Sequence, residues 1–215
     1  MKRFIALFLS LIMLISLSAC GKTVVREEGS CGKLARWTLD SDGVLTISGR
    51  KNMDDFLYHG TPWHDSRENI RAVVVEEGIT HLGDNAFEGC EKLETVTLAE
   101  SVTSMGISVF ANCPKLVSVT GSEHLTQLGD NAFDSCESLT ALELNAELTA
   151  IGRCAFYNCT SLASVTIPET VTFIDSFAFF GWTEEQSVNI SLAQPHRAWS
   201  DTWDHDSNAV FNWNA

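Results

Sequence analysis

The chain has 215 residues, of which 45% are hydrophobic and 20% charged, a composition that fits one globular or solenoid unit with short appendages. Its formal net charge of −14 argues against nucleic acid as a partner, because phosphate binding needs clustered Lys and Arg. The same acidity argues against electrostatic docking on an anionic bilayer, and its simplest role is solubility.

The first 19 residues have the form of an export signal. A basic start is followed by an apolar run from Phe4 to Leu17, which has 14 residues where a membrane-spanning helix needs ~20. The run ends in Leu17-Ser18-Ala19-Cys20, which resembles the bacterial lipobox, whose Cys is acylated and becomes the new amino terminus. We expect lipid attachment at Cys20 and a polar tether over residues 20–30. The alternative is an ordinary signal that ends in Cys.

Residues 31–70 differ from the rest of the chain and are expected to form a β-rich cap. Stretches 34–39 and 44–48 alternate apolar and polar residues around the turn sequence 40–43, which predicts a β-hairpin. An aromatic cluster with turn residues follows, which comprises Met53, Phe56, Tyr58, Pro62 and Trp63. Such a segment can cover the open apolar end of a repeat array.

From Leu82 to Trp182 one pattern returns every 23 residues. Its Phe positions are Phe87, Phe110, Phe133, Phe156 and Phe179. Its Cys positions are Cys90, Cys113, Cys136 and Cys159, and Trp182 takes the fifth place. Leu and Val pairs follow in phase, such as Leu93 with Val96. A period of roughly 20–29 residues with these apolar positions is typical of a leucine-rich-repeat solenoid, so we expect a repeat array over residues 71–182.

Each repeat is expected to form one coil of the solenoid. Val96 and Leu98 alternate with Thr95 and Thr97, which predicts a short strand that stacks on its equivalents in a parallel sheet. Residues 102–105 predict a second extended piece on the opposite wall. The Gly-Asp/Asn-x-Ala-Phe segment predicts a short helical turn, capped in three repeats by Asp84-Asn85, Asp130-Asn131 and Asp175-Ser176. The Phe file would form the core ladder.

The Cys file admits two interpretations, a disulfide or metal ladder and a row of buried thiols. Equal spacing points the four thiols the same way, one per coil, which suits neither the disulfide torsion nor four ligands converging on one zinc ion. We therefore expect reduced structural thiols. Cys31 and Cys154 lie outside the file, and a bridge between them would have to cross about four coils. Gly121, where Leu98, Leu144 and Ile167 stand in other repeats, predicts a local bulge or loosened strand.

The last segment, residues 183–215, contains Trp199, Trp203, Phe211 and Trp213. These rings could stack on a sugar, but we expect them to cover the last coil, because an open solenoid end is an aggregation edge.

Several stretches of this chain resemble BspA-like leucine-rich-repeat proteins, which are surface and secreted proteins of gut and oral bacteria and some protists. The stretches are Cys31-Gly32, Trp37-Thr38-Leu39, Asp42-Gly43, 45–49, Pro62-Trp63, 82–90 and 181–186. The resemblance implies an α/β-poor, right-handed solenoid of about five 23-residue repeats, mainly short β-strands with short helical turns, capped at both ends. It also implies an adhesive role. One departure is Ser207-Asn208-Ala209, where related tails often place a Cys.

Solenoids usually bind through the outward residues of the sheet. In this chain the candidate binding residues are Thr95, Thr97, Ser118, Thr120, Ala141, Glu143, Ser164, Thr166, Ser187 and Asn189. A second file of hydroxyls is expected on the opposite wall, at Thr80, Thr103, Thr126, Thr149 and Thr172. Because Thr also suits exposed β positions, both sets have a purely structural interpretation.

No catalytic residues and no metal site are expected. His59 and His64 lie near Asp54, Asp55 and Asp65 in the sequence. A second His-bearing acidic patch comprises His196, Asp201, Asp204, His205 and Asp206. Neither has a ligand spacing such as His-Glu-x-x-His, and Ser108, Ser135 and Ser161 lack the Gly-x-Ser-x-Gly elbow.

The sequence thus predicts a monomeric cell-surface lipoprotein, without cofactors, held on the membrane only by its lipid. Its expected role is non-enzymatic binding of an extracellular protein or glycan. Two other classes stay open, a structural envelope protein without a specific ligand and a hydrolase that uses the His and Asp patches.

Overall fold

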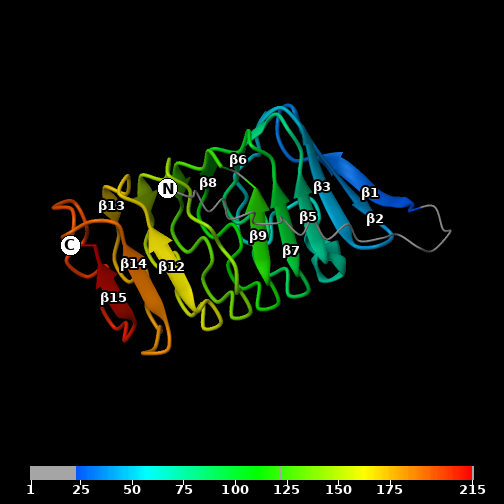
Figure 1. Ribbon diagram of the computed structural model, residues 1–215. Coiled ribbons are helices and arrows are strands. Elements are labelled where there is room, and N and C mark those ends of the chain that lie inside the picture. The colour runs from blue at the N-terminus through cyan, green and yellow to red at the C-terminus, as the bar shows by residue number, and fades with distance from the viewer. Residues whose placement is uncertain (1–22, 122, 215) are drawn as a thin grey trace, which may run out of the picture.

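The computed structural model describes residues 23–121 and 123–214, which wind into a β-solenoid with two main walls (Figure 1). The front wall begins with a six-stranded sheet of β1 (Val25–Ser30), β2 (Ala35–Asp40), β3 (Val44–Gly49), β5 (Ala72–Val75), β7 (Thr95–Leu98) and β9 (Ser118–Gly121). It continues with a second sheet of β12 (Ser164–Ile167), β14 (Ser187–Ile190) and β15 (Val210–Trp213).

The back wall is one six-stranded sheet. Its strands are β4 (Lys51–Asn52), β6 (Ile79–Leu82), β8 (Ser104–Met105), β10 (Gln127–Leu128), β11 (Ala150–Ile151) and β13 (Phe173–Ile174). In both walls the parallel strands of the array pair residues that lie 23 apart, for example Thr95 with Ser118 and Gln127 with Ala150. Equal coil length therefore sets the register, and the predicted solenoid is confirmed.

The third side of each coil differs from the prediction. The short helix η1 (His64–Asn69) is the only helix among the described residues, and the Gly-Asp/Asn-x-Ala-Phe segments form hydrogen-bonded turns. Their amides point to the next coil: Asn85 donates to the carbonyl of Ile107 at 2.8 Å, and Phe87 to that of Val109 at 2.9 Å. Asp84 also serves the next coil, because its Oδ1 accepts from the amide of Ile107. Bonding between coils thus replaces the expected helical cap.

Two files of left-handed residues make these turns. The first comprises Asn85, Ser108, Asn131, Cys154 and Phe177, all with φ between 53° and 59°. The second comprises Gly89, Asn112, Ser135, Asn158 and Gly181, with φ between 54° and 81°. Asn and Gly adopt this conformation at the lowest cost, and Cys and Phe at a higher one. The residues of each file therefore share a left-handed backbone conformation, although their side chains differ.

The interior holds a continuous stack of rings, as predicted. The centroids of Phe110 and Phe133 lie 5.6 Å apart with the planes inclined by 13°, and those of Phe133 and Phe156 lie 6.0 Å apart and inclined by 2°. Trp63 extends the stack towards the N-terminus, 5.8 Å from Phe87. All six rings are buried, so the ladder is the core of the array.

The six cysteines of the described chain are free thiols, and five of them are buried. Each of three thiols donates a hydrogen bond to the carbonyl of the Phe in the preceding coil, as Cys136 does to Phe110 at 3.1 Å. Trp182 occupies the fifth place of the file, and its Nε1 donates to the carbonyl of Phe156 at 2.9 Å. The file therefore links the coils through weak donors rather than through disulfides.

The N-terminal segment contains the predicted hairpin of β2 and β3, and the structure adds one strand to it. Residues 25–30, expected to belong to the tether, form β1, which pairs antiparallel with β2 from Val25↔Asp40 to Ser30↔Arg36. The tether prediction is therefore wrong for these residues, because β1 supplies the outermost strand of the front wall. The signal segment and Cys20 lie outside the described residues.

The C-terminal segment both covers the last coil and extends the wall. β14 pairs in parallel with β12, and β15 pairs in parallel with β14, so the wall continues past residue 182, where the array was expected to end. Trp199 and Trp203 are 6% exposed, and Trp203 lies edge-on to Phe179 at 6.0 Å. The expected aromatic cover is present, and it closes the Phe stack.

The front wall is interrupted in one coil. Residues 141–144 form no strand, and a single bridge joins Ser118 to Ala141. Gly121 was the expected weak point, yet it still lies on β9, paired with Leu98. The interruption falls one coil later.

In the described chain no helix is long and apolar enough to cross a membrane.

Candidate binding face

The outward residues of the front wall form a flat, hydroxyl-rich surface. Along β7, Thr95 and Thr97 are exposed while Val96 and Leu98 are buried, and β12 repeats this alternation. Eight of the ten predicted face residues stand on strands, which are Thr95, Thr97, Ser118, Thr120, Ser164, Thr166, Ser187 and Asn189. The other two, Ala141 and Glu143, are exposed but belong to the interrupted coil. The expectation of a strand there is wrong.

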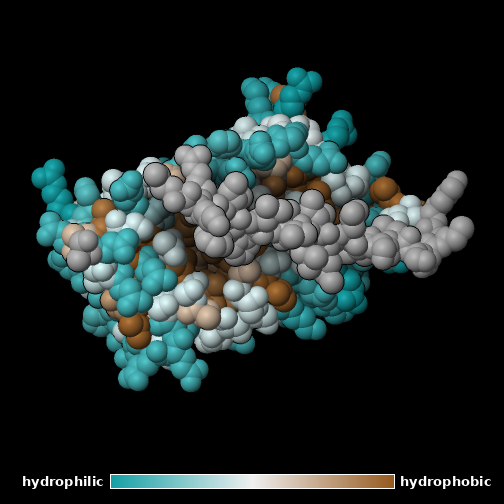
Figure 2. All heavy atoms as spheres, viewed as in Figure 1, coloured by the Kyte–Doolittle hydropathy of each residue, from teal (hydrophilic) through white to brown (hydrophobic). Residues whose placement is uncertain are grey.

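The interruption opens a groove in the middle of this face. Its volume is about 370 Å³, and it is lined by Val119, Thr120, Gly121, Glu123, Ala141, Leu142, Glu143, Leu144 and Asn145. Leu142 and Leu144 are only partly buried, whereas the equivalent residues of the following repeat, Val165 and Ile167, are buried. Apolar surface is visible near the middle of the molecule in Figure 2, within mainly hydrophilic surroundings.

The physical cause of the groove lies in the core beneath it. Gly121 has no side chain where the other coils place Val, Leu or Ile, and a void of about 20 Å³ remains among Leu98, Met105, Leu142 and Leu144. A larger residue could not take its place, because a Cβ on Gly121 would lie 2.0 Å from the carbonyl oxygen of Leu98. The groove thus combines an apolar floor with two carboxylates, Glu123 and Glu143, at its margin.

The hydroxyl file on the back wall serves the fold. Thr103 Oγ1 donates to the backbone carbonyl of Thr80 at 3.1 Å, and Thr126, Thr149 and Thr172 repeat this bond coil by coil. Thr80 in turn donates to the side chain of Asn52 at 2.9 Å. These hydroxyls already have partners in the protein, so the front wall is the better candidate for contact with a ligand.

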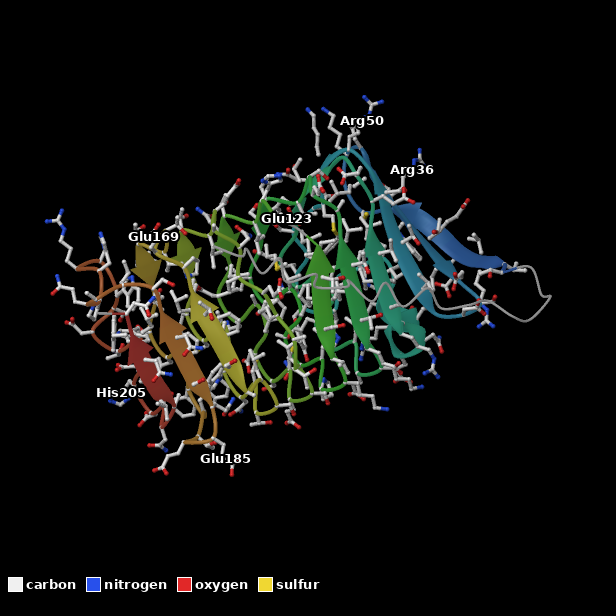
Figure 3. All side chains as sticks on the ribbon, in the orientation of Figure 1. Arg36, Arg50, Glu123, Glu169, Glu185 and His205 are labelled. Atoms are coloured by element: carbon white, nitrogen blue, oxygen red, sulfur yellow. The ribbon has the colours of Figure 1, made fainter. Side chains whose placement is uncertain are left out.

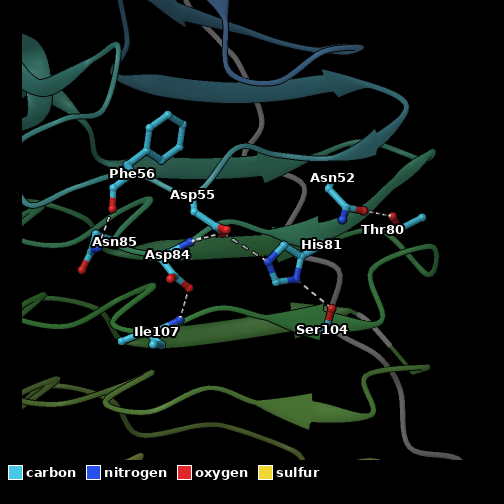
Figure 4. Close-up of polar contacts among 9 residues, drawn as sticks. All are labelled: Asn52, Asp55, Phe56, Thr80, His81, Asp84, Asn85, Ser104 and Ile107. Atoms are coloured by element: carbon cyan, nitrogen blue, oxygen red, sulfur yellow. Dashed lines mark hydrogen bonds and ion pairs between the residues drawn. The ribbon is translucent and has the colours of Figure 1, made fainter.

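A chain of polar side chains crosses the first coils of the back wall (Figure 4). Asp55 Oδ1 lies 3.7 Å from Nε2 of His81, whose Nδ1 lies 2.8 Å from Oγ of Ser104. These residue types match a hydrolase triad, but the amides of Thr103 and Gly106 donate to the carbonyls of Thr80 and Leu82. They are therefore not available as oxyanion donors. Sequence reasoning missed this contact, although His81 and Ser104 lie one repeat apart.

Within each of the two His-bearing patches, the structure brings only some of the residues into contact. Nδ1 of His59 lies 3.1 Å from Nε2 of His64, which also contacts Arg67. Lost hydration, His64 and Arg67 all lower the pKa of His59. In the tail, His205 contacts Asp206 at 2.9 Å. Within residues 23–121 and 123–214, no three His, Cys, Asp or Glu side chains converge in a way that could hold a metal ion.

Stacked coils, a buried ring ladder and one exposed polar wall define a solenoid repeat protein. The chain belongs to the BspA-type leucine-rich repeat family, whose repeat region matches residues 64–191 in six copies. The match begins within the segment expected to be a cap and extends beyond residue 182, in agreement with the additional strands.

Two leucine-rich repeat proteins are among the solved structures that are similar to the chain. A leucine-rich repeat protein from Eubacterium ventriosum is 33% identical over 80% of this chain, with a TM-score of 0.70. The chain spans only 45% of that protein. A leucine-rich repeat protein from T. pallidum is 24% identical, with a TM-score of 0.56 and 84% of each chain covered, a likeness of fold alone. A search of the curated proteins found no match.

Proposed function

We propose that this chain is a surface lipoprotein whose front wall binds an extracellular protein or glycan without chemical change. The observation that carries the proposal is the groove of about 370 Å³ on the front wall, where the hydroxyl of Thr120 donates to the carbonyl of Val96 but the face hydroxyls of the described chain form no continuous ladder between coils. Its exposed apolar floor can bury a partner side chain, and the surrounding hydroxyls can donate and accept hydrogen bonds. Repeat scaffolds commonly bind through such a wall.

The proposal includes acylation at Cys20, which rests on the resemblance of residues 17–20 to the lipobox. The attached chain would hold the solenoid at the cell surface in many copies. A wall of few coils gives a modest interface, so attachment would gain from multivalency. Mass spectrometry of the purified protein should find acyl chains on Cys20, and Cys20→Ala should release the protein from cells.

The binding test compares two substitutions in the same coil. Thr120→Lys places a bulky cation on the front wall beside the groove, and Gln127→Lys places the same cation on the back wall, at an exposed position of β10. Cells that display each variant are tested for attachment to immobilised extracellular proteins and glycans. We expect Thr120→Lys to reduce attachment at least tenfold and Gln127→Lys to leave it unchanged. Equal attachment by wild-type and chain-deficient cells would instead favour the structural envelope protein.

A further inference from the structure

The charge of the chain changes along the solenoid axis. Residues 72–215 hold four Lys and Arg against 20 Asp and Glu, a formal net charge of −16. Residues 23–71 hold seven Lys and Arg against eight Asp and Glu, a net charge of −1. The N-terminal end is therefore nearly neutral, and the rest of the molecule is strongly acidic. The net charge of the whole chain conceals this difference.

Four of the cations of the N-terminal end gather in what we call the basic corner, made of Lys33, Arg36, Arg50 and Lys51. Pairing of β2 with β3 brings the corner together, because the amide of Arg50 donates to the carbonyl of Leu34 at 3.0 Å. All four side chains are exposed, and none forms an ion pair within the described chain. Arg36 and Arg50 lie at the same end of the molecule in Figure 3.

Apolar side chains accompany these cations. Leu34, 50% exposed, stands between Lys33 and Arg36, beside a hollow of about 500 Å³. Lys33, Leu34, Arg50, Lys51, Met53 and the single carboxylate Asp54 are among the residues that line it. Val24 and Val25, which are 59% and 51% exposed, lie at the far end of the edge formed by β1, next to Asp40, and do not belong to the corner. Exposed apolar groups among Lys and Arg are typical of surfaces that enter the headgroup region of a bilayer.

Along the edge that follows the corner, the sign of the charge reverses. Glu77, Glu100, Glu123 and Glu169 recur at multiples of 23 residues, and they belong to the turns that join the front wall to the back wall. Glu123 and Glu169 lie beyond Arg50 along the solenoid in Figure 3. A negatively charged surface would attract the corner and repel these coils, and so would hold the solenoid on its N-terminal end.

We propose that the N-terminal end, through the basic corner and Leu34, docks on an anionic lipid surface. The expected position of the membrane relative to the solenoid rests on the proposed function, in which Cys20 is acylated. An acylated Cys20 lies five residues before Val25, so an extended chain keeps β1 within about 18 Å of the bilayer. Each coil lies about 4.8 Å farther from the bilayer than the coil before it. Electrostatic attraction is screened over about 10 Å at 0.1 M salt, so the coils nearest to the bilayer contribute most to the attraction. The array then extends away from the membrane, and the groove on its front wall opens to the side.

The test uses fragment 21–215, which contains every described element, closes its own core at both ends and lacks Cys20. Its binding is measured by co-sedimentation with vesicles of phosphatidylcholine alone and with added phosphatidylglycerol. We expect binding only to the anionic vesicles, falling as the salt concentration rises. Lys33→Glu/Lys51→Glu should weaken binding at least tenfold, and Leu34→Ser should weaken it further in combination. Lys92→Glu/Lys115→Glu, the matched pair in the array, should keep wild-type binding.

Absence of binding to anionic vesicles at low salt would overturn the proposal. So would equal losses in the two Lys pairs, or binding to soluble heparin without binding to vesicles, since the corner would then be a site for soluble polyanions. Thermal unfolding of each variant identifies loss of fold. Because the fragment cannot be acylated at Cys20, failure of the anchor would leave this measurement unchanged.

Discussion

The thiol of Cys113 donates a hydrogen bond to the backbone carbonyl of Phe87, 3.2 Å away in the preceding coil. The Cys file and the Phe file therefore stabilise the same contact between coils. The Phe rings stack on one another, and the thiols donate hydrogen bonds to the backbone carbonyls of the same Phe residues. Both residues are fully buried, so the carbonyl has no access to water. The carbonyl also accepts from the amide of Cys90 at 3.3 Å, and the thiol adds a second, weak donor of small volume without crowding the interior.

The first prediction concerns this link. Cys113→Ala removes the donor and leaves a small void, and we expect it to lower the free energy of unfolding by about 1–2 kcal/mol. The loss is measured by urea denaturation. Cys154→Ala is the control, because Cys154 is only partly buried and lies outside the file. Equal losses in the two variants would contradict a special role for the bond to Phe87.

The second prediction concerns alkaline pH. Burial raises the pKa of Cys90 and of Cys136 from 9.0 to about 12, and it raises those of Cys113 and Cys159 well above 9.0. A pKa higher in the folded than in the unfolded chain means that the stabilisation is complete below pH 9.0 and is lost as the pH rises towards 12. The free energy of unfolding should therefore fall above pH 9.0, by at most about 1.4 kcal/mol per pH unit and thiol.

Urea denaturation at a series of pH values measures this fall. A variant with Ala at Cys90, Cys113, Cys136 and Cys159 is the control, and its stability should change less over the same range. A native protein that reacts rapidly with a thiol reagent at all six described cysteines at pH 8 would contradict the burial on which the prediction rests.

The third prediction concerns the ring stack. Phe133 is fully buried between Phe110 and Phe156, so Phe133→Ala should cost about 3–5 kcal/mol of unfolding free energy. Phe173, also in the array but 40% exposed, is the matched control, and Phe173→Ala should cost about 0.5 kcal/mol or less. Chemical denaturation of both variants measures the two losses of unfolding free energy. Similar losses would contradict a main contribution of the ring stack to stability.

Periodicity revealed those features that depend on identical spacing. Residues 23 apart fall on the same side of successive coils, so the sequence alone located the Phe stack, the Cys file and the outward Thr residues of β7. The strand β1 was missed because its six residues are too polar to show a buried face. Its pairing depends on the edge of β2, which a local pattern does not reveal.

The left-handed files were missed for another reason. Asn85, Cys154 and Phe177 share a backbone angle and not a side-chain type, so a search for repeated residues passes over them. The sequence did not predict the groove itself; it predicted only a bulge or loosened strand at Gly121. A missing side chain in one coil loosens the coil stacked on it, so the loss of pairing appears at residues 141–144. That consequence depends on packing between coils.

The last prediction separates two glycines that share a left-handed conformation. Gly89 has φ of 68° with nothing within 4 Å of an added Cβ, whereas Gly121 has φ of 84° and a Cβ there would lie 2.0 Å from the oxygen of Leu98. Asn112 and Asn158 occupy the file of Gly89, so Gly89→Asn should change the unfolding free energy by about 0.5 kcal/mol or less. Gly121→Asn should cost at least about 2 kcal/mol, because β9 must move away from β7.

Thermal and urea unfolding compare these two variants directly. The same conformational cost enters both, so the difference between them measures the contact with Leu98. Movement of β9 would also reshape the groove, so Gly121→Asn should reduce ligand attachment while Gly89→Asn preserves it. If Gly121→Asn were as stable as Gly89→Asn, the close approach of β9 to Leu98 would be wrong, and with it the physical origin given for the groove.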